Sequence, residues 1–247
     1  MIQRYFIQLS YDGTTFHGWQ IQPNAKSIQE TLNFALSTIT RQEIYVVGCG
    51  RTDTGVHASQ FYAHFESEEI ELEPVCYKVN RMLPPQIAVQ RIFKVAKDTH
   101  ARFSATSRIY EYRITMAKNP FLVHRAYELR EEMDIALMNK AGEMCQDFTD
   151  FSSFAKASDV KTNLCDLHYA RWERKDEMIL FEVKANRFLR NMVRSMVGTI
   201  IEIGRKRVSL EQFEKIVESK NRSKAGYSVP AHGLYLKEIG YPQGLLE

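Results

Sequence analysis

The fold of the chain is indicated first by residues 3–39, which read QRYFIQLSYDGTTFHGWQIQPNAKSIQETLNFALSTI. At the start of this stretch, Tyr5, Ile7 and Leu9 place apolar side chains at every second position, the period of a strand with a buried face. Ser27-Ile28-Gln29-Glu30 matches a helix capping box, and the apolar residues after it are spaced for one face of a helix. The stretch therefore predicts a strand followed by a helix.

The remainder of the first half continues this alternation. Apolar runs at residues 44–47 and 60–65 predict two further strands. A helix is predicted to begin near Pro74 and to stop at Pro84-Pro85, because proline is tolerated in the first turn of a helix but not inside it. Residues 87–95 predict another strand. The predicted order is βαββαβ.

The second half repeats this order with a different sequence. It contains a predicted strand at 108–115, helix at 134–144, strands at 166–174 and 178–184, helix at 187–203 and strand at 233–239, with an extra helix from Ser209. The fold class is therefore α+β, with two split-βαβ (ferredoxin-like) units. We expect them to form a shared antiparallel sheet with helices on one side and an interdomain active-site cleft. The expected domains are residues 1–103 and 104–247.

Composition limits the class of protein. With 247 residues, of which 44% are hydrophobic, the chain can bury a sizeable core, which excludes a disordered or fibrous protein. No run approaches the roughly 20 apolar residues that cross a bilayer, and no signal sequence is evident at the start, so we expect no membrane association and a cytoplasmic location. The cysteines Cys49, Cys76, Cys145 and Cys165 are scattered singly, which favours buried thiols over a zinc site or disulfides.

The net charge of +3 is unevenly distributed. Between Lys184 and Lys224 there are eleven Lys or Arg against four Glu. Such a cluster is typical either of a solvated surface or of a surface that binds a polyanion.

The segment Gly50-Arg51-Thr52-Asp53-Thr54-Gly55-Val56-His57-Ala58 is the strongest local signal for a functional site. Its glycines permit a tight backbone where a loop approaches a ligand. Arg51 and His57 are close cations that would keep the Asp53 carboxylate ionised, and such a carboxylate can act as nucleophile, general base or metal ligand. No second carboxylate stands at ligand spacing, so no metal is expected. An Asp that caps a turn, with Arg51 in a surface ion pair, accounts equally well for the loop alone.

Two further groups of residues suit contact with nucleic acid. Arg108, Tyr110 and Tyr112 would share one face of a strand, which suits base stacking and phosphate contact, although core tyrosines have the same pattern. Arg187, Arg190 and Arg194 recur along one edge of the predicted helix 187–203, where they would be solvated or bind phosphate. Arg194 stands among apolar residues and would need an anionic partner, for which Asp53 is available.

Together these segments resemble the TruA family of tRNA pseudouridine synthases over nearly the whole chain. The matching segments are Tyr11-Asp12-Gly13-Thr14, His17-Gly18-Trp19-Gln20, the Asp53 loop, Ala101-Arg102-Phe103-Ser104-Ala105, Arg108 and Tyr110, Phe188-Leu189-Arg190 with Met192-Val193-Arg194, and Gly233-Leu234-Tyr235-Leu236. The chain departs from the family pattern at Cys49, Thr54, Thr99 and Gln146, none of which is expected to take part in the reaction.

The resemblance implies conversion of uridine to pseudouridine in the anticodon stem-loop of tRNA, typically at positions 38, 39 and 40, by a homodimer without a cofactor. It implies that Asp53 is the catalytic nucleophile. It also implies that Tyr110, Arg194 and Leu234 bind the substrate, and we add Arg51 from the same loop as Asp53.

Two alternatives remain open at this point. One is a pseudouridine synthase that acts at other RNA sites, because family resemblance indicates the chemistry better than the choice of site. The other is a non-catalytic RNA-binding module, since paired split-βαβ units with exposed aromatics also describe RNA-recognition domains. The Lys/Arg-Gly-aromatic signature of those domains is absent from this sequence.

Overall fold

The computed structural model describes residues 1–157 and 162–246, and the chain divides into two compact units. Unit 1 comprises Met1–Thr106 and Leu236–Glu247, and unit 2 comprises Ser107–Tyr235. The last strand, β9 (Leu234–Gly240), therefore begins in unit 2 and ends in unit 1. The division expected from the sequence keeps this strand entirely in the second half.

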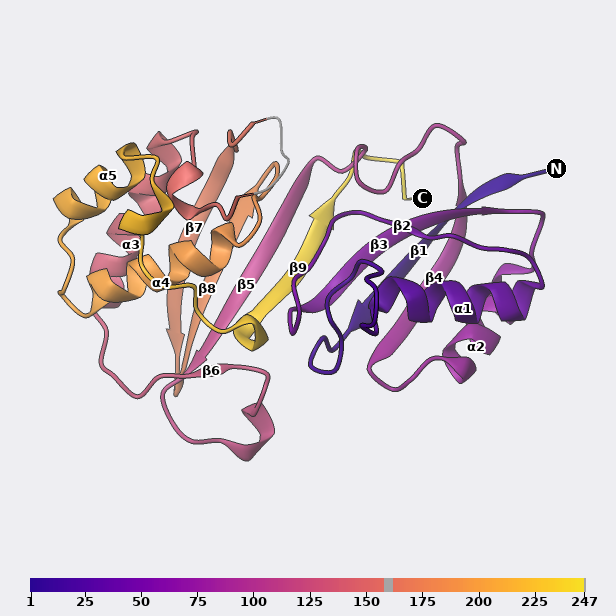
Figure 1. Cartoon of the computed structure of the whole chain (residues 1–247), viewed down its shortest axis with the longest axis horizontal. Helices are drawn as coiled ribbons and strands as arrows, with labels where there is room; N and C mark the ends of the chain where they lie inside the picture. Colours follow the sequence, from indigo (N-terminus) through magenta and orange to yellow (C-terminus); the bar gives the residue numbers. More distant parts are fainter. Residues whose placement is uncertain (158–161, 247) are drawn as a thin grey trace. The chain divides into compact units, whose positions relative to one another are not determined.

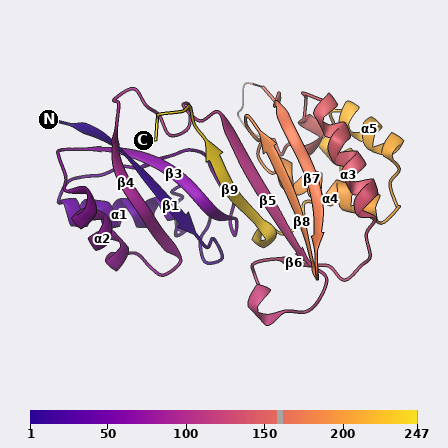
Figure 2. The same cartoon turned by 180° about the vertical axis from the view of Figure 1, so that it is seen from behind.

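Unit 1 has the predicted order of elements. These are β1 (Gln3–Tyr11), α1 (Ile28–Thr40), β2 (Val47–Gly48), β3 (His57–Ser67), α2 (Leu72–Met82) and β4 (Ile87–Val95). Strand β1 lies between β3 and β4 and is antiparallel to both, while β2 pairs with β3. The part of β9 that belongs to this unit lies next to β3. Helices α1 and α2 lie on one face of these strands (Figures 1 and 2).

Strand β1 contributes to the core of unit 1. Tyr5, Ile7 and Leu9 are buried as their spacing predicts, and the apolar stripe of α1 is buried as well. Phe6, on the opposite face of the strand, is also fully buried, because it packs in an aromatic cluster with Tyr62, Phe93 and Tyr241. The second face of β1 is thus buried at Phe6 and half-buried at Arg4, Gln8 and Ser10.

Unit 2 follows the same order with additions. Its elements are β5 (Ser107–Thr115), β6 (Tyr127–Glu128), α3 (Ile135–Met144), β7 (Leu167–Lys175), β8 (Met178–Ala185), α4 (Met192–Gly204) and α5 (Leu210–Glu218). Strand β8 lies between β5 and β7 and is antiparallel to both, and the short β6 is parallel to β5. Helices α3, α4 and α5 lie on one face of this unit (Figures 1 and 2). The α+β class and the mainly antiparallel pairing agree with the sequence prediction.

The start of α4 corrects one prediction. The helix begins at Met192 rather than at Arg187, because Asn191 adopts a left-handed conformation with φ 66°. The backbone of the preceding segment is hydrogen-bonded to other parts of the unit. The amide of Asn186 donates to the carbonyl of Asp166 and the amide of Lys156 donates to the carbonyl of Arg190, both at 3.0 Å. Of the three arginines predicted along this helix, only Arg194 is on it.

In the part of the chain that the structure describes, no helix is long and apolar enough to cross a membrane. Cys49, Cys145 and Cys165 are buried, as expected, and Cys76 is half-buried. Burial raises the pKa of Cys145 to about 12 and that of Cys165 to about 11, so both remain protonated thiols at neutral pH.

Candidate active site

The loop that carries Asp53 joins β2 to β3 and is supported through its backbone. Asp53 is half-buried, whereas Arg51 is exposed. The carbonyl of Asp53 accepts a hydrogen bond from the amide of Val56 at 3.1 Å, which closes a tight turn that begins at Asp53. The buried neighbour Thr52 is bound twice: its hydroxyl pairs with the Tyr11 hydroxyl at 2.9 Å, and its carbonyl accepts from the amide of Trp19 at 3.2 Å. The backbone on both sides of Asp53 is thus fixed.

Two glycines allow a second loop, residues 12–20, to pack directly on the Asp53 loop. A β-carbon at Gly13 would lie 2.0 Å from the carbonyl oxygen of Val56. A β-carbon at Gly18, where φ is +84°, would lie 2.3 Å from the carbonyl oxygen of Thr52. Both distances are far inside van der Waals contact, so the two backbones approach this closely only because these positions have no side chain.

His57 is buried at the base of the loop. The amide of Gly13 lies 3.1 Å from its Nδ1, and a carboxylate oxygen of Asp12 lies 3.2 Å from the same atom. Because an amide can only donate, Nδ1 is the acceptor of the hydrogen bond from Gly13. His57 therefore connects the first residue of β3 to the Asp12-Gly13 segment of the second loop.

The first residues of α1 are hydrogen-bonded to the second loop. The amides of Ile28 and Gln29, which have no partner inside the helix, donate to the carbonyls of Gly18 and Trp19 at 3.2 and 3.0 Å. The indole of Trp19 is buried and stacks on Phe61 with ring centroids 4.2 Å apart. The segment His17-Gly18-Trp19-Gln20 is therefore a support that connects α1 to the Asp53 loop.

In unit 2, Tyr110 and Tyr112 differ in burial although both are on the helix-facing side of β5. Tyr112 is completely buried, its hydroxyl donates to the carbonyl of Pro230 at 2.8 Å, and burial raises the pKa of its phenol far above the usual value. Tyr110 is half-buried and meets the ring of Phe188 edge to face, with centroids 5.1 Å apart and planes at 86°. The core-tyrosine interpretation thus applies to Tyr112, while Tyr110 retains an accessible surface.

Arg194 lies in the first turn of α4 and is half-buried. Its Nε donates to the carbonyl of Val229 at 2.7 Å, and the amide of Val229 donates back to the carbonyl of Arg194 at 3.2 Å. This pairing fixes the segment that leads to the buried Leu234, and a β-carbon at Gly233 would lie 2.6 Å from the Tyr112 ring. Arg194, Tyr112 and the approach to Leu234 therefore form one packed group.

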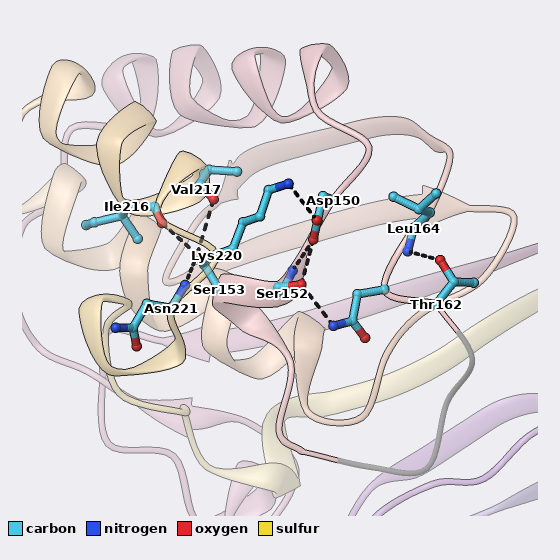
Figure 3. Close-up of polar contacts among 10 residues, drawn as sticks. Asp150, Ser152, Ser153, Thr162, Leu164, Ile216, Val217, Lys220 and Asn221 are labelled. Atoms are coloured by element: carbon cyan, nitrogen blue, oxygen red, sulfur yellow. Dashed lines mark hydrogen bonds and ion pairs between the residues drawn. The ribbon is translucent and has the colours of Figure 1, made fainter.

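The segment after α3 is attached to both neighbouring helices. Figure 3 shows the Ser153 hydroxyl, which donates to the carbonyl of Ile216 on α5 at 2.6 Å, and the ion pair of 3.1 Å between Lys220 and Asp150. The hydroxyl of Ser195 on α4 donates to the carbonyl of Phe154 at 2.9 Å. These contacts hold the backbone that binds the carbonyl of Arg190.

The predicted site residues thus fall into two groups. Asp53 and Arg51 belong to unit 1, whereas Tyr110, Arg194 and Leu234 belong to unit 2. The supporting contacts of Gly13, Gly18 and Phe188 were not predicted, although all three stand inside the motifs quoted from the sequence. Within residues 1–157 and 162–246, no group of three or more His, Cys, Asp or Glu side chains is arranged to hold a metal ion.

Comparison with known proteins identifies the family. A family model described as tRNA pseudouridine synthase matches residues 8–104 and 147–242. A protein of Bacteroides fragilis named tRNA pseudouridine synthase A is 48% identical over 250 residues, which cover 100% of this chain and 99% of that protein. Proteins of the same name from Bacteroides thetaiotaomicron and Acetivibrio thermocellus are 47% and 37% identical and cover 99% and 94% of this chain, or 93% and 97% of their own lengths. The chain therefore belongs to the TruA family of tRNA pseudouridine synthases.

Proposed function

We propose that this protein is an isomerase that converts uridine to pseudouridine in the anticodon stem-loop of tRNA, at positions 38, 39 and 40. The observation that carries this proposal is similarity over the full length to proteins named tRNA pseudouridine synthase A, with Asp53 in a rigidly supported loop.

The reaction rearranges bonds within one nucleotide. The bond from C1′ to N1 breaks, a bond from C1′ to C5 forms, the C5 proton leaves, and N1 gains a proton. Substrate and product are isomers, so the reaction requires no electron carrier, and we propose that it needs no cofactor. The uridine must leave the base stack to be reached, which costs a few kcal/mol that contacts with the RNA must offset.

We assign the role of nucleophile to Asp53. Its carboxylate would either attack C1′ or remove a proton from C2′ to give a glycal, and in both routes the detached uracil turns and rejoins through C5. The hydrogen bonds of Thr52 and the turn closed by Val56 support this role, because they fix the backbone that positions the carboxylate. The exposed Arg51 would contact the RNA from the same loop.

The residues of unit 2 would bind the base. Tyr110 would stack on the uracil, with its hydroxyl available to accept the C5 proton, and Phe188 would hold the Tyr110 ring in place. Leu234 would line the pocket. Arg194 would pair with Asp53 through its terminal nitrogens, since its Nε is bound to Val229. This proposal requires both groups of residues to act on one uridine, and it includes the shared sheet and the cleft expected from the sequence.

A homodimer and a cytoplasmic location are part of the same proposal; the homodimer derives from the sequence resemblance and the location from the composition of the sequence. Sedimentation equilibrium of the purified protein tests the first and fractionation of cells tests the second.

The decisive experiment replaces Asp53 with Asn and measures release of tritium from [5-³H]uridine in unmodified tRNA. We expect turnover to disappear in Asp53→Asn and to persist in Asp98→Asn, a matched change at an exposed aspartate of unit 1. Turnover in Asp53→Asn at the wild-type rate would overturn the assignment. Mapping pseudouridine in tRNA from cells that lack the protein tests the positions, since the modification should be absent from residues 38, 39 and 40 alone.

A further inference from the structure

The loop between β5 and β6 carries an exposed apolar tip. Phe121 is 80% exposed and Val123 is 58% exposed. Among the described residues, only the terminal Met1 is a more exposed large apolar side chain than Phe121. Figures 1 and 2 show this loop, with its short helical turn, extending beyond the end of β5. Two neighbouring apolar side chains at such a tip indicate a contact surface, because they gain nothing from the core of their own unit.

The tip is held in one shape by its own hydrogen bonds. The side-chain oxygen of Asn119 accepts from the amide of Phe121 at 2.9 Å, and the backbone carbonyl of Asn119 accepts from the amide of Leu122 at 3.1 Å. The carbonyl of Leu122 then accepts from the amides of Arg125 and Ala126 at 2.9 and 3.0 Å. A preorganised tip loses little conformational entropy when it binds a partner.

The base of the loop is attached to the residues on both sides of Leu234. The hydroxyl of Tyr235 donates to the carbonyl of Arg125 at 2.8 Å. The ring of His124 meets the ring of His232 at right angles, with centroids 6.1 Å apart. Since Leu234 stands between His232 and Tyr235, the loop is tied to the segment that would line the uracil pocket.

The charge of the loop favours an anionic partner. Residues 117–126 contain Lys118, His124 and Arg125 and no acidic residue. An aromatic tip with basic flanks is the combination that binds unstacked nucleic acid, because the ring stacks on a base while the cations contact phosphates.

From these observations we propose that the loop of residues 117–126 is an RNA-contacting element, and that Phe121 stacks on a base next to the uridine that leaves the helix. The proposal rests on the proposed function, since it takes its position from Leu234. An apolar side chain inserted beside an extruded base replaces part of the lost stacking, which lowers the cost of extrusion.

The protein offers a direct spectroscopic test, because its two native tryptophans, Trp19 and Trp172, are buried. Phe121→Trp places an exposed indole at the tip, and its fluorescence should be quenched by unmodified tRNA. Phe34→Trp on α1, where the native ring is 66% exposed, is the matched control and should not respond. We also expect Phe121→Ala to weaken tRNA binding about tenfold and Phe34→Ala to weaken it less than twofold.

Three results would overturn the proposal: no quenching of Phe121→Trp at tRNA concentrations that saturate binding, wild-type affinity in Phe121→Ala, or a change of oligomeric state in Phe121→Ala in sedimentation experiments. The last result would assign the tip to a protein interface instead. Tritium release by the wild-type protein is measured in parallel, so that a failure of the proposed function, seen as no release, is distinguished from a failure of the Phe121 contact.

Discussion

Gly18 shows how a single residue without a side chain determines the position of the Asp53 loop. Its φ of +84° is unfavourable for any residue with a β-carbon, and a β-carbon there would lie 2.3 Å from the carbonyl oxygen of Thr52. Gly50, inside the Asp53 loop itself, differs in both respects: its φ is not in the left-handed region, and a β-carbon there would meet nothing within 4 Å. The two glycines therefore form a matched pair for mutation.

We predict that Gly18→Ala destabilises the protein by more than about 1 kcal/mol, because it adds backbone strain and a clash that displaces Thr52. Gly50→Ala should change the free energy of unfolding by no more than about 0.5 kcal/mol. Urea denaturation measures both, and tritium release should fall in Gly18→Ala. Equal stability of the two variants would contradict the role assigned to Gly18.

At the scale of elements, the start of α4 is determined by Asn191. Its left-handed conformation ends the irregular segment that contains Arg187 and Arg190, and its side-chain amide donates to the hydroxyls of Ser195 and Ser228 at 2.8 and 2.6 Å. Because Arg194 lies in the first turn of α4, the position of its guanidinium depends on where the helix begins.

We predict a ranked effect at this position. Asn191→Gly should lose the two amide hydrogen bonds but keep the left-handed backbone at little cost. Asn191→Ala should lose the same hydrogen bonds and, in addition, add the strain of a β-carbon in the left-handed conformation. The loss in unfolding free energy should therefore be about 1 kcal/mol for Gly and about 2 kcal/mol or more for Ala. Urea denaturation ranks the two variants by their free energy of unfolding. An Ala variant as stable as the Gly variant would show that the left-handed conformation of residue 191 does not contribute to the difference.

At the scale of the whole molecule, stability depends on pH through a buried histidine of unit 1. His64 on β3 is 5% exposed, and its Nδ1 accepts from the amide of Ala101 at 3.2 Å. Burial, with His100 and Arg4 nearby, lowers its pKa from 6.5 to about 4. As the pH falls from 6.5 towards 4, the unfolded chain takes up a proton at His64 that the folded protein does not, so this group lowers the stability progressively over that window.

We predict that the wild-type protein loses more stability between pH 7 and pH 5 than His64→Gln, whose side-chain oxygen can still accept from Ala101 but does not titrate. His168→Gln is the control, because the His168 side chain is 38% exposed. Urea denaturation at the two pH values provides the comparison. The same pH dependence in wild type and His64→Gln would exclude His64 as its source.

The sequence by itself determined the order of the elements and the local character of the site. Strand and helix periods are properties of neighbouring residues, so Tyr5, Ile7 and Leu9 predicted β1, and the stripe after Ser27 predicted α1. The glycine-rich stretch around Asp53 likewise predicted a tight loop, because backbone freedom is a property of each glycine.

The tertiary structure decided what local patterns leave open. Tyr110 and Tyr112 stand two residues apart on the same face of β5, yet Tyr112 is buried where it packs against Pro230 and Gly233, whereas Tyr110 is half-buried beside Phe188. The apolar period continued through Arg187 to Arg194, yet α4 begins at Met192, because Asn191 is left-handed and the amide of Lys156 occupies the carbonyl of Arg190. In both cases contacts with residues distant in the sequence take part, and local propensities do not report such contacts.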